Sequence, residues 1–333
     1  MSIQVGILGN ASIARRSLIP AFSAHPDFEL IGVASRSGDV SYADMVARDD
    51  VDLIYCPLPT GLHYEWVMKA LKAGKHVLCE KSLACTSAEV EDLVNMARDQ
   101  GRLLMESFQF KFHPQNLHVK ELLAGNAIGE LRQMVVRFGI PPFPEGEKNI
   151  RYYRELGGGA LLDNGAYTIK ATTYLLGNDV KVLAAVQGGG TIVGASPDQA
   201  PSVDITGALM LMARYHQSSG RKTQNLELGT CSPRLVPVQT AYGFDHFYQC
   251  GYEIWGTEGK ITTTRAFTAR EGFEAPVILE TKAGRVVKTF NADHFARLLD
   301  YVSSRISSND FETEYAECQT QANLIEAAQK CMV

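Results

Sequence analysis

The sequence lacks any apolar run of about 18 residues, the length that a membrane-crossing helix requires. Its opening, MSIQVGILGN, lacks the charged segment and the small-residue cleavage site of a signal peptide. It also has no excess of positive charge, because 32 Lys and Arg stand against 37 Asp and Glu, a net charge of −5. Proteins that bind nucleic acid generally need a basic surface. We therefore expect a cytoplasmic protein that binds neither a membrane nor nucleic acid.

Paired cysteines are lacking too. The seven cysteines are an odd number without a C-x-x-C pair, and several lie in apolar, strand-like segments. Reduced, mostly buried thiols are therefore expected. No metal site is predicted. The cysteines are Cys56, Cys79, Cys85, Cys231, Cys250, Cys318 and Cys331.

The 333 residues, 45% of them apolar, are enough for two domains with real cores. In residues 1–125, apolar strand patterns alternate with helical patterns. This alternation is typical of a doubly wound parallel sheet, so the first domain is predicted to be an α/β Rossmann domain. The strands are expected at 3–9, 28–35, 52–56, 76–79 and 102–106, and the helices at 12–24, 63–74 and 86–100.

Residues 126–333 have a different pattern, with many strands and few helices. They predict an α+β domain built on a mainly antiparallel sheet, which would bind the substrate. Helical patterns occupy residues 159–176, 293–307 and 314–331, and the last two could pack back on the first domain.

A dinucleotide fingerprint is expected at the first strand-to-helix turn. Gly9, Asn10, Ala11, Ser12 and Ile13 fit it, with alanines at the second and third glycine positions. Free amides at the start of the helix would then face a pyrophosphate. Small residues also permit tight packing at such a turn, but the strands that follow favour cofactor binding.

The end of the second strand favours NADP(H) over NAD(H). An NAD site usually has an acidic residue there, which binds the ribose 2′-hydroxyl. This sequence has Ser35, Arg36 and Ser37 instead, and an arginine can pair with a 2′-phosphate. The alternative is a solvated loop arginine.

A second cofactor loop is expected after the third strand, where prolines stiffen the chain. Its position permits contact with the ribose or the nicotinamide, and Thr60 is predicted to cap a helix that begins near Leu62. His63 is more typical of a structural histidine at the start of a helix than of a catalytic one. The cofactor contacts predicted here are Pro57, Leu58, Pro59, Thr60, Leu62 and His63.

Two segments carry candidate active-site residues. In GKHVLCEKS (74–82), Lys81 follows a short buried strand, at the end where open α/β sheets bind their ligands. In GGGALLDNGAY (157–167), Asp163 and Tyr167 are one helical turn apart, behind a triglycine that we expect to be flexible. They would hold a substrate hydroxyl. The alternative is a surface helix with an ordinary polar stripe.

Together these stretches resemble the Gfo/Idh/MocA family of NAD(P)-dependent oxidoreductases, over nearly the whole chain. The resemblance also uses FHPQ (112–115) and IGELR (128–132). It implies a Rossmann domain and a second domain with a large open antiparallel sheet, through which members often form dimers or tetramers. It implies active-site roles for Lys81 and Asp163, and it puts Tyr167 where many members have histidine. It further implies cofactor contacts by Glu80 and Lys81, and substrate contacts by Lys81, Gln109, Asp163 and Tyr167.

Within the family, the sequence is most similar to nucleotide-sugar C3-ketoreductases of deoxysugar biosynthesis. The likeness is carried by residues 150–167, FHPQ, YEIWGTEGKI (252–261) and RAFT (265–268). It implies NADPH-dependent reduction of a 3-keto group on a nucleotide-linked hexose, with Tyr167 as proton donor. A phenol with a pKa near 10 keeps its proton at neutral pH, and an ammonium such as Lys81 would stabilise the oxyanion.

Two departures from the family pattern carry expectations of their own. Ser82 stands where proline is usual, which predicts a looser turn. The segment 37–42, which follows Arg36 and leads to the next helix, is shortened relative to the family pattern, which predicts a thin adenine side of the sheet and weaker cofactor binding.

Two alternatives remain. One is an NADP-linked dehydrogenase of a free sugar, cyclitol or dihydrodiol. The other is a non-catalytic dinucleotide sensor, against which the set of Lys81, Asp163 and Tyr167 argues.

Overall fold

The computed structural model describes residues 2–142, 149–189, 203–216 and 233–331. Its contacts divide the chain into two compact units. Unit 1 consists of Met1–Gln109, Lys148–Asp163 and His294–Glu326, and unit 2 consists of Phe110–Glu147, Asn164–Asp293 and Ala327–Val333. Residues that directly precede Asp163 therefore belong to unit 1, although they follow the first strand of unit 2 in the sequence.

Unit 1 is built on a parallel five-stranded sheet in the order β2-β1-β3-β4-β5, which confirms the Rossmann prediction. The central strands are apolar and buried throughout, as expected where helices cover both faces of a sheet. The strands are β1 (Ile3–Leu8), β2 (Phe28–Ala34), β3 (Leu53–Cys56), β4 (His76–Cys79) and β5 (Leu104–Glu106).

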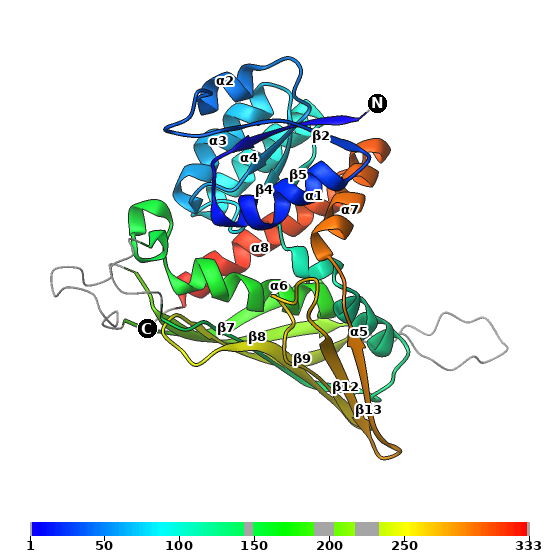
Figure 1. Ribbon diagram of the computed structural model, residues 1–333. Helices are drawn as coiled ribbons and strands as arrows, with labels where there is room; N and C mark the ends of the chain where they lie inside the picture. The colour runs from blue at the N-terminus through cyan, green and yellow to red at the C-terminus, as the bar shows by residue number, and fades with distance from the viewer. Residues whose placement is uncertain (1, 143–148, 190–202, 217–232, 332–333) are drawn as a thin grey trace. The chain divides into compact units, whose positions relative to one another are not determined.

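The helices of unit 1 pack in pairs, α1 with α7 and α3 with α4 (Figure 1). The chain moves from β1 to β2 in one direction and from β3 to β5 in the other. Right-handed crossovers therefore put the connecting helices on opposite faces and leave a switch point between β1 and β3. The helices are η1 (Ala14–Leu18, a π-helix), α1 (Ile19–Ala24), α2 (Tyr42–Ala47), α3 (Thr60–Lys72), α4 (Ser87–Gln100), α7 (His294–Ser308) and α8 (Glu312–Lys330).

Helix α4 begins with a capping box, which the spacing of Thr86 and Glu89 in the sequence predicts. The Thr86 hydroxyl accepts the Glu89 N–H, and the Glu89 carboxylate accepts the Thr86 N–H. At the other end of the chain, α8 lies beside β5, where the Tyr315 hydroxyl donates to the Arg102 carbonyl at 2.5 Å. The terminal helices thus contribute to the core of unit 1.

Unit 2 contains an eight-stranded sheet in the order β13-β12-β11-β10-β6-β9-β8-β7. All neighbouring strands are antiparallel except β6 and β9, which are parallel. This confirms the mainly antiparallel sheet. Its strands are β6 (Leu131–Gly139), β7 (Val180–Gly188), β8 (Thr206–Tyr215), β9 (Arg234–Gly243), β10 (Gln249–Gly256), β11 (Gly259–Thr263), β12 (Ala275–Thr281) and β13 (Gly284–Phe290).

The helix expected at 159–176 is present as a π-helical turn, η5 (Leu161–Gly165), followed by α6 (Ala166–Leu176). Helix α6 lies along the sheet of unit 2 against β6, β8 and β9, while α5 (Pro114–Ala124) packs near β12 and β13 (Figure 1). Ten of the eleven residues of α6 are buried. The alternative of a surface helix with a polar stripe is therefore wrong.

Across the described ranges, no helix is long and apolar enough to cross a membrane. The six described cysteines are free thiols, and four of them are buried, as the sequence predicted. Cys231 lies outside the described residues.

Candidate active site

Lys81 lies just beyond the carboxyl end of β4, where it forms an ion pair with Asp163. The ammonium donates to the Asp163 carboxylate through Oδ1 and to the Asp163 carbonyl oxygen at 3.3 Å. The two side chains are only 11% and 16% exposed, so water screens the pair weakly. Both residues belong to unit 1. The structure therefore brings together two residues that are 82 positions apart in the chain.

Asp163 has a second cationic partner that the sequence did not predict. The Nε atom of Arg151 donates to the other carboxylate oxygen, Oδ2, at 2.5 Å. Burial raises the pKa of Asp163, but the charges of Arg151 and Lys81 and their hydrogen bonds lower it more. The net pKa lies well below the usual range, so the carboxylate is ionised at neutral pH. The 12-residue separation has no helical or strand period, so no local pattern signalled the pair.

The triglycine at 157–159 is closely packed, and the expectation that it is a flexible entrance is wrong. Gly159 donates its N–H to the Arg151 carbonyl at 2.9 Å, with φ at +118°, a conformation that side chains disfavour. A Cβ on Gly158 would lie 2.4 Å from the same carbonyl, and one on Gly157 would lie 2.7 Å from the backbone of Gly61. The glycines thus let this loop pack against the start of α3 while it carries Arg151 and Asp163.

Ser82 does not loosen the turn after Lys81, contrary to the expectation from the missing proline. Its side chain is buried, and its hydroxyl donates to the Leu162 carbonyl at 2.9 Å. Its own carbonyl oxygen lies 2.8 Å from Nδ1 of His63. Proline has no hydroxyl and could not tie the lysine turn to the Asp163 segment in this way.

His63 is fully buried between two segments of unit 1, behind the loop that follows β3. Its Nε2 lies 2.7 Å from the Leu58 carbonyl and its Nδ1 faces the Ser82 carbonyl. Burial lowers the pKa of His63, which favours the neutral ring. A neutral ring carries a proton on only one of its two nitrogens. This geometry supports the structural interpretation of His63 over a catalytic one.

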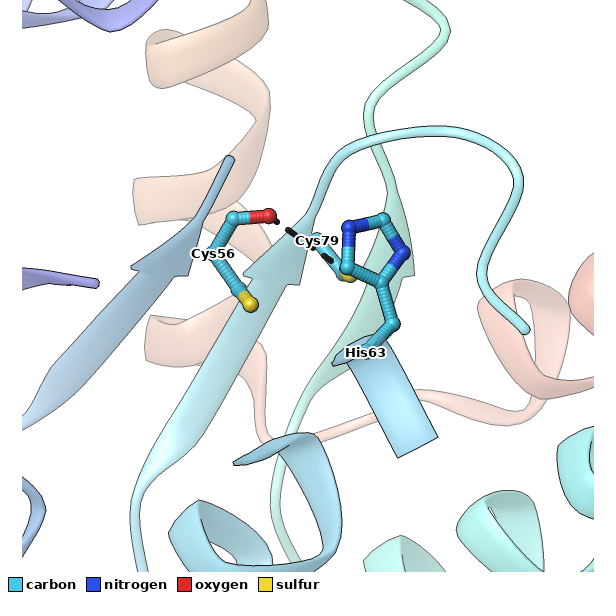
Figure 2. A group of neighbouring side chains, drawn as sticks. All are labelled: Cys56, His63 and Cys79. Carbon is cyan, nitrogen blue, oxygen red and sulfur yellow. Dashed lines mark hydrogen bonds between the residues drawn. The ribbon is translucent and has the colours of Figure 1, made fainter. Parts of the chain in front are cut away.

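Cys56 and Cys79 lie next to this histidine, on the carboxyl ends of β3 and β4 (Figure 2). Their sulfur atoms and a ring nitrogen of His63 lie within 4.8 Å of one another, a spacing that metal ligands can have. However, a metal would have to displace a carbonyl from His63, and burial raises the pKa of the Cys79 thiol well above its usual range. Cys79 is therefore favoured as a neutral thiol, whereas a metal needs thiolate ligands, so this group fits a metal poorly.

The loop after β3 approaches the first turn of the sheet closely. Gly9 has φ at +110°, and a Cβ there would lie 2.8 Å from the Leu58 side chain. Helix α3 begins at Thr60 itself, after Pro59, whose ψ of 143° is extended. Thr60 therefore does not cap the helix, and that prediction is wrong, because a capping residue must precede the first helical one. Leu62 lies in the first turn of α3.

The turn after β1 holds the remaining fingerprint residues. Its first hydrogen bond joins the Gly9 N–H to the Ala34 carbonyl at 2.8 Å. Ser12 accepts a 2.7 Å hydrogen bond from Nε of Arg16, and Nη1 of Arg15 donates to the Asn10 carbonyl at 2.5 Å. Asn10 and Ala11 precede the helical backbone, and Ser12 and Ile13 begin it just before the π-helical turn η1.

The residues expected to determine the preference for NADP(H) over NAD(H) lie just after β2, at the edge of the sheet. Ser35 accepts the Gly38 N–H at 3.3 Å and donates its own N–H to the Val40 carbonyl at 3.2 Å, which closes a tight turn. Arg36 and Ser37 are exposed on this turn. Helix α2 follows at once, capped by Ser41, whose hydroxyl accepts the Asp44 N–H. Among the described residues no strand lies beyond β2, in agreement with the expected thin adenine side.

Glu80 and Gln109 lie near the same end of the sheet. The Glu80 carboxylate accepts a 3.0 Å hydrogen bond from the Tyr55 hydroxyl, and burial raises its pKa. Gln109 begins the short 3₁₀ helix η2 (Gln109–Phe112) after β5.

Tyr167 belongs to unit 2, four residues after Asp163 in the chain. Its ring is 8% exposed and contacts Phe110, Phe138 and Phe267, with ring centroids 5.1 to 5.9 Å apart. Edge-on and tilted aromatic contacts of this kind hold a ring in one orientation.

The chain belongs to the GFO/IDH/MocA oxidoreductase family. Residues 3–108 match the family's NAD-binding Rossmann fold, and residues 116–262 match the GFO/IDH/MocA C-terminal domain. These matches agree with the parallel sheet of unit 1 and the large, mostly antiparallel sheet of unit 2.

The relatives of this chain include sugar reductases. It is 37% identical over 296 residues to a dTDP-3,4-didehydro-2,6-dideoxy-alpha-D-glucose 3-reductase of Saccharopolyspora spinosa, covering 84% of this chain and 80% of that protein. It is 34% identical to the enzyme of the same name from Actinomadura kijaniata, covering 98% and 94%. A solved structure of KijD10, a 3-ketoreductase from Actinomadura kijaniata in complex with NADP and TDP-benzene, matches with a TM-score of 0.85 and 33% identity, covering 100% and 98%.

Proposed function

We propose that this protein is an NADPH-dependent reductase of the 3-keto group of a nucleotide-linked deoxyhexose. The observation that carries the proposal is the largely buried Lys81–Asp163 ion pair at the carboxyl end of β4. Similarity to dTDP-sugar 3-reductases over nearly the whole chain supports the substrate class.

The turns after β1 and β2 fit NADPH. The backbone at Gly9 approaches the loop of residues 57–60 at the switch point of the sheet, where doubly wound folds bind dinucleotides. Residues 35–38 include no carboxylate, and the exposed Arg36 suits a 2′-phosphate. When bound, NADPH supplies the hydride for reduction.

The proposed chemistry converts a ketone to an alcohol by the addition of a hydride and a proton. The Lys81 ammonium stabilises the oxyanion that develops on the carbonyl oxygen, and Asp163 holds Lys81 in place. Tyr167 gives its hydroxyl proton to that oxygen, because a phenol is protonated at neutral pH. Gln109 is a proposed substrate contact.

The proposal is tested by the loss of NADPH absorbance with two matched substrates. One is the dTDP-linked 3-keto sugar that the relatives' names specify, generated in situ, and the other is the same sugar without the nucleotide. We expect turnover of the first, with kcat/KM at least about tenfold higher than for the second, since binding to the nucleotide contributes to the transition state. NADPH binding without turnover of any keto sugar would favour a dinucleotide sensor. Preference for the free sugar would favour a dehydrogenase of free sugars.

We also propose a homo-oligomer, a dimer or a tetramer, joined through the sheet of unit 2. Large apolar side chains on its strands are exposed in the single chain, and an interface formed through the sheet would bury them. They are Leu183 and Val186 on β7, Leu235 on β9 and Trp255 on β10. Light scattering should give a mass of two or four chains, which Leu235→Asp should reduce; a monomeric wild type would refute the proposal.

A further inference from the structure

Two cations share the carboxylate of Asp163, and they come from different parts of unit 1. Lys81 follows β4 and takes Oδ1, while Arg151, in the 3₁₀ turn η3 (Ile150–Tyr152), takes Oδ2. The arrangement differs from a simple Lys–Asp pair, because each carboxylate oxygen has its own cation.

The second cation changes the charge of the group. The charges of Lys81 and Asp163 alone would sum to zero. In a weakly screened pair of this kind, the carboxylate charge would largely cancel that of the ammonium. With Arg151 the three groups sum to +1. A net positive charge stabilises a developing alkoxide better than a neutral pair does.

Two hydrogen bonds fix the backbone of Arg151, one at its N–H and one at its carbonyl oxygen. The Asn149 side chain accepts the Arg151 N–H at 3.1 Å, and Gly159 donates to the Arg151 carbonyl at 2.9 Å. The close approach of Gly158 to the same carbonyl leaves no room for a Cβ. A solvated surface arginine would not need such fixed anchoring.

We propose that Arg151 is a positioning residue for the keto reduction. It binds one oxygen of Asp163, orients the other toward Lys81, and keeps the net charge of these three side chains positive. The inference rests on the proposed function. Arg151 acts through Asp163 and is assigned no contact with the substrate.

The test compares Arg151→Gln, Arg151→Lys and wild type in NADPH turnover of the dTDP-linked 3-keto sugar. Arg151→Gln should lower kcat by between about tenfold and about 10²-fold, the scale of a misplaced catalytic group, with NADPH affinity unchanged. The charged side chains that act on Asp163 are Arg151, from η3, and Lys81, from the end of β4. Losing Arg151 should therefore move the acidic limb of the kcat–pH profile to higher pH. Arg151→Lys should recover part of the turnover, and added methylguanidine should do the same for Arg151→Gln.

Arg154→Gln is the matched control, because it removes the same charge from an exposed position in the same loop. Circular dichroism identifies variants that fail to fold, and Arg151→Lys then carries the comparison. Equal losses in Arg151→Gln and Arg154→Gln, or an unchanged kcat and pH profile in Arg151→Gln, would overturn the inference. Absence of turnover in the wild type would instead refute the proposed function on which it rests.

Discussion

The hydroxyl of Ser82 donates a 2.9 Å hydrogen bond to the carbonyl oxygen of Leu162. These residues directly follow Lys81 and directly precede Asp163, so the bond runs beside the ion pair and ties the same two segments together. Both the ion pair and the hydrogen bond lie in unit 1. The position of Lys81 relative to Asp163 is thus held twice, once by charge and once by a neutral, buried contact.

Ser82→Ala should lower both stability and turnover. The variant leaves the Leu162 carbonyl without its donor in a buried place, which costs about 1–3 kcal/mol. Thermal unfolding should show a midpoint lower by a few degrees, and kcat should fall because Asp163 is less firmly placed. Ser304→Ala, at an exposed position on α7, is the control and should change neither quantity. Identical behaviour of the two variants would mean that the Ser82 bond has no role.

Lys81→Ala should cut kcat by roughly 10²-fold or more, because it removes the charge that stabilises the oxyanion. The fold should persist, since Arg151 still pairs with Asp163. Titration calorimetry should show NADPH affinity changed much less than kcat. Lys69→Ala removes a half-exposed lysine from α3 as a control. Near-normal turnover of Lys81→Ala would assign Lys81 a structural role only.

Tyr167→Phe should lower kcat by roughly 10²–10⁴-fold, the usual contribution of a positioned general acid. The ring should remain in its contacts with Phe110, Phe138 and Phe267, so substrate binding should survive. Steady-state kinetics with the nucleotide-linked substrate separate the two effects. Tyr64→Phe, which removes a hydroxyl from α3, is the matched control. Unchanged turnover of the Tyr167 variant would show that the proton comes from another group.

The wild-type protein should bind NADPH at least about tenfold more tightly than NADH, a difference of about 1.4 kcal/mol. The reason is the exposed Arg36 after β2, where an acidic residue would bind the ribose of NAD. Arg36→Asp should reverse the preference because it repels the 2′-phosphate and accepts from the 2′-hydroxyl. Calorimetric titration of both proteins with both cofactors measures this, and equal affinities in the wild type would contradict it.

The ion pairs of Asp163 should stabilise the fold in a pH-dependent way. The folded-state pKa of Asp163 is lowered, so this contribution is complete above the unfolded pKa of about 4 and is lost as pH falls toward the folded value. The difference in free energy of unfolding between wild type and Asp163→Asn should therefore be largest above about pH 5 and shrink on acidification. Urea unfolding at a series of pH values measures it. A constant difference would show that the Asp163 pKa is not lowered.

Much of the fold could be predicted because it follows local patterns. The apolar runs of the first 125 residues predict parallel strands, and Thr86 with Glu89 predicts the start of α4. Lys81 was predicted as a site residue because it directly follows a buried strand, and Asp163 because it follows the triglycine. Thr60 was assigned wrongly as a cap because the sequence does not show where the extended Pro59 ends and helical backbone begins.

The contacts that organise the candidate site depend on folding. Lys81 meets Asp163 across 82 positions, and Ser82 meets Leu162 across 80, distances over which no helical or strand period extends. Arg151 reaches Asp163 because close-packed glycines turn the loop back on itself. A local sequence pattern predicts the backbone conformation of the residues within it. These hydrogen bonds and ion pairs join segments that are separated in the sequence, so they form only when the segments pack together at the carboxyl end of the unit 1 sheet.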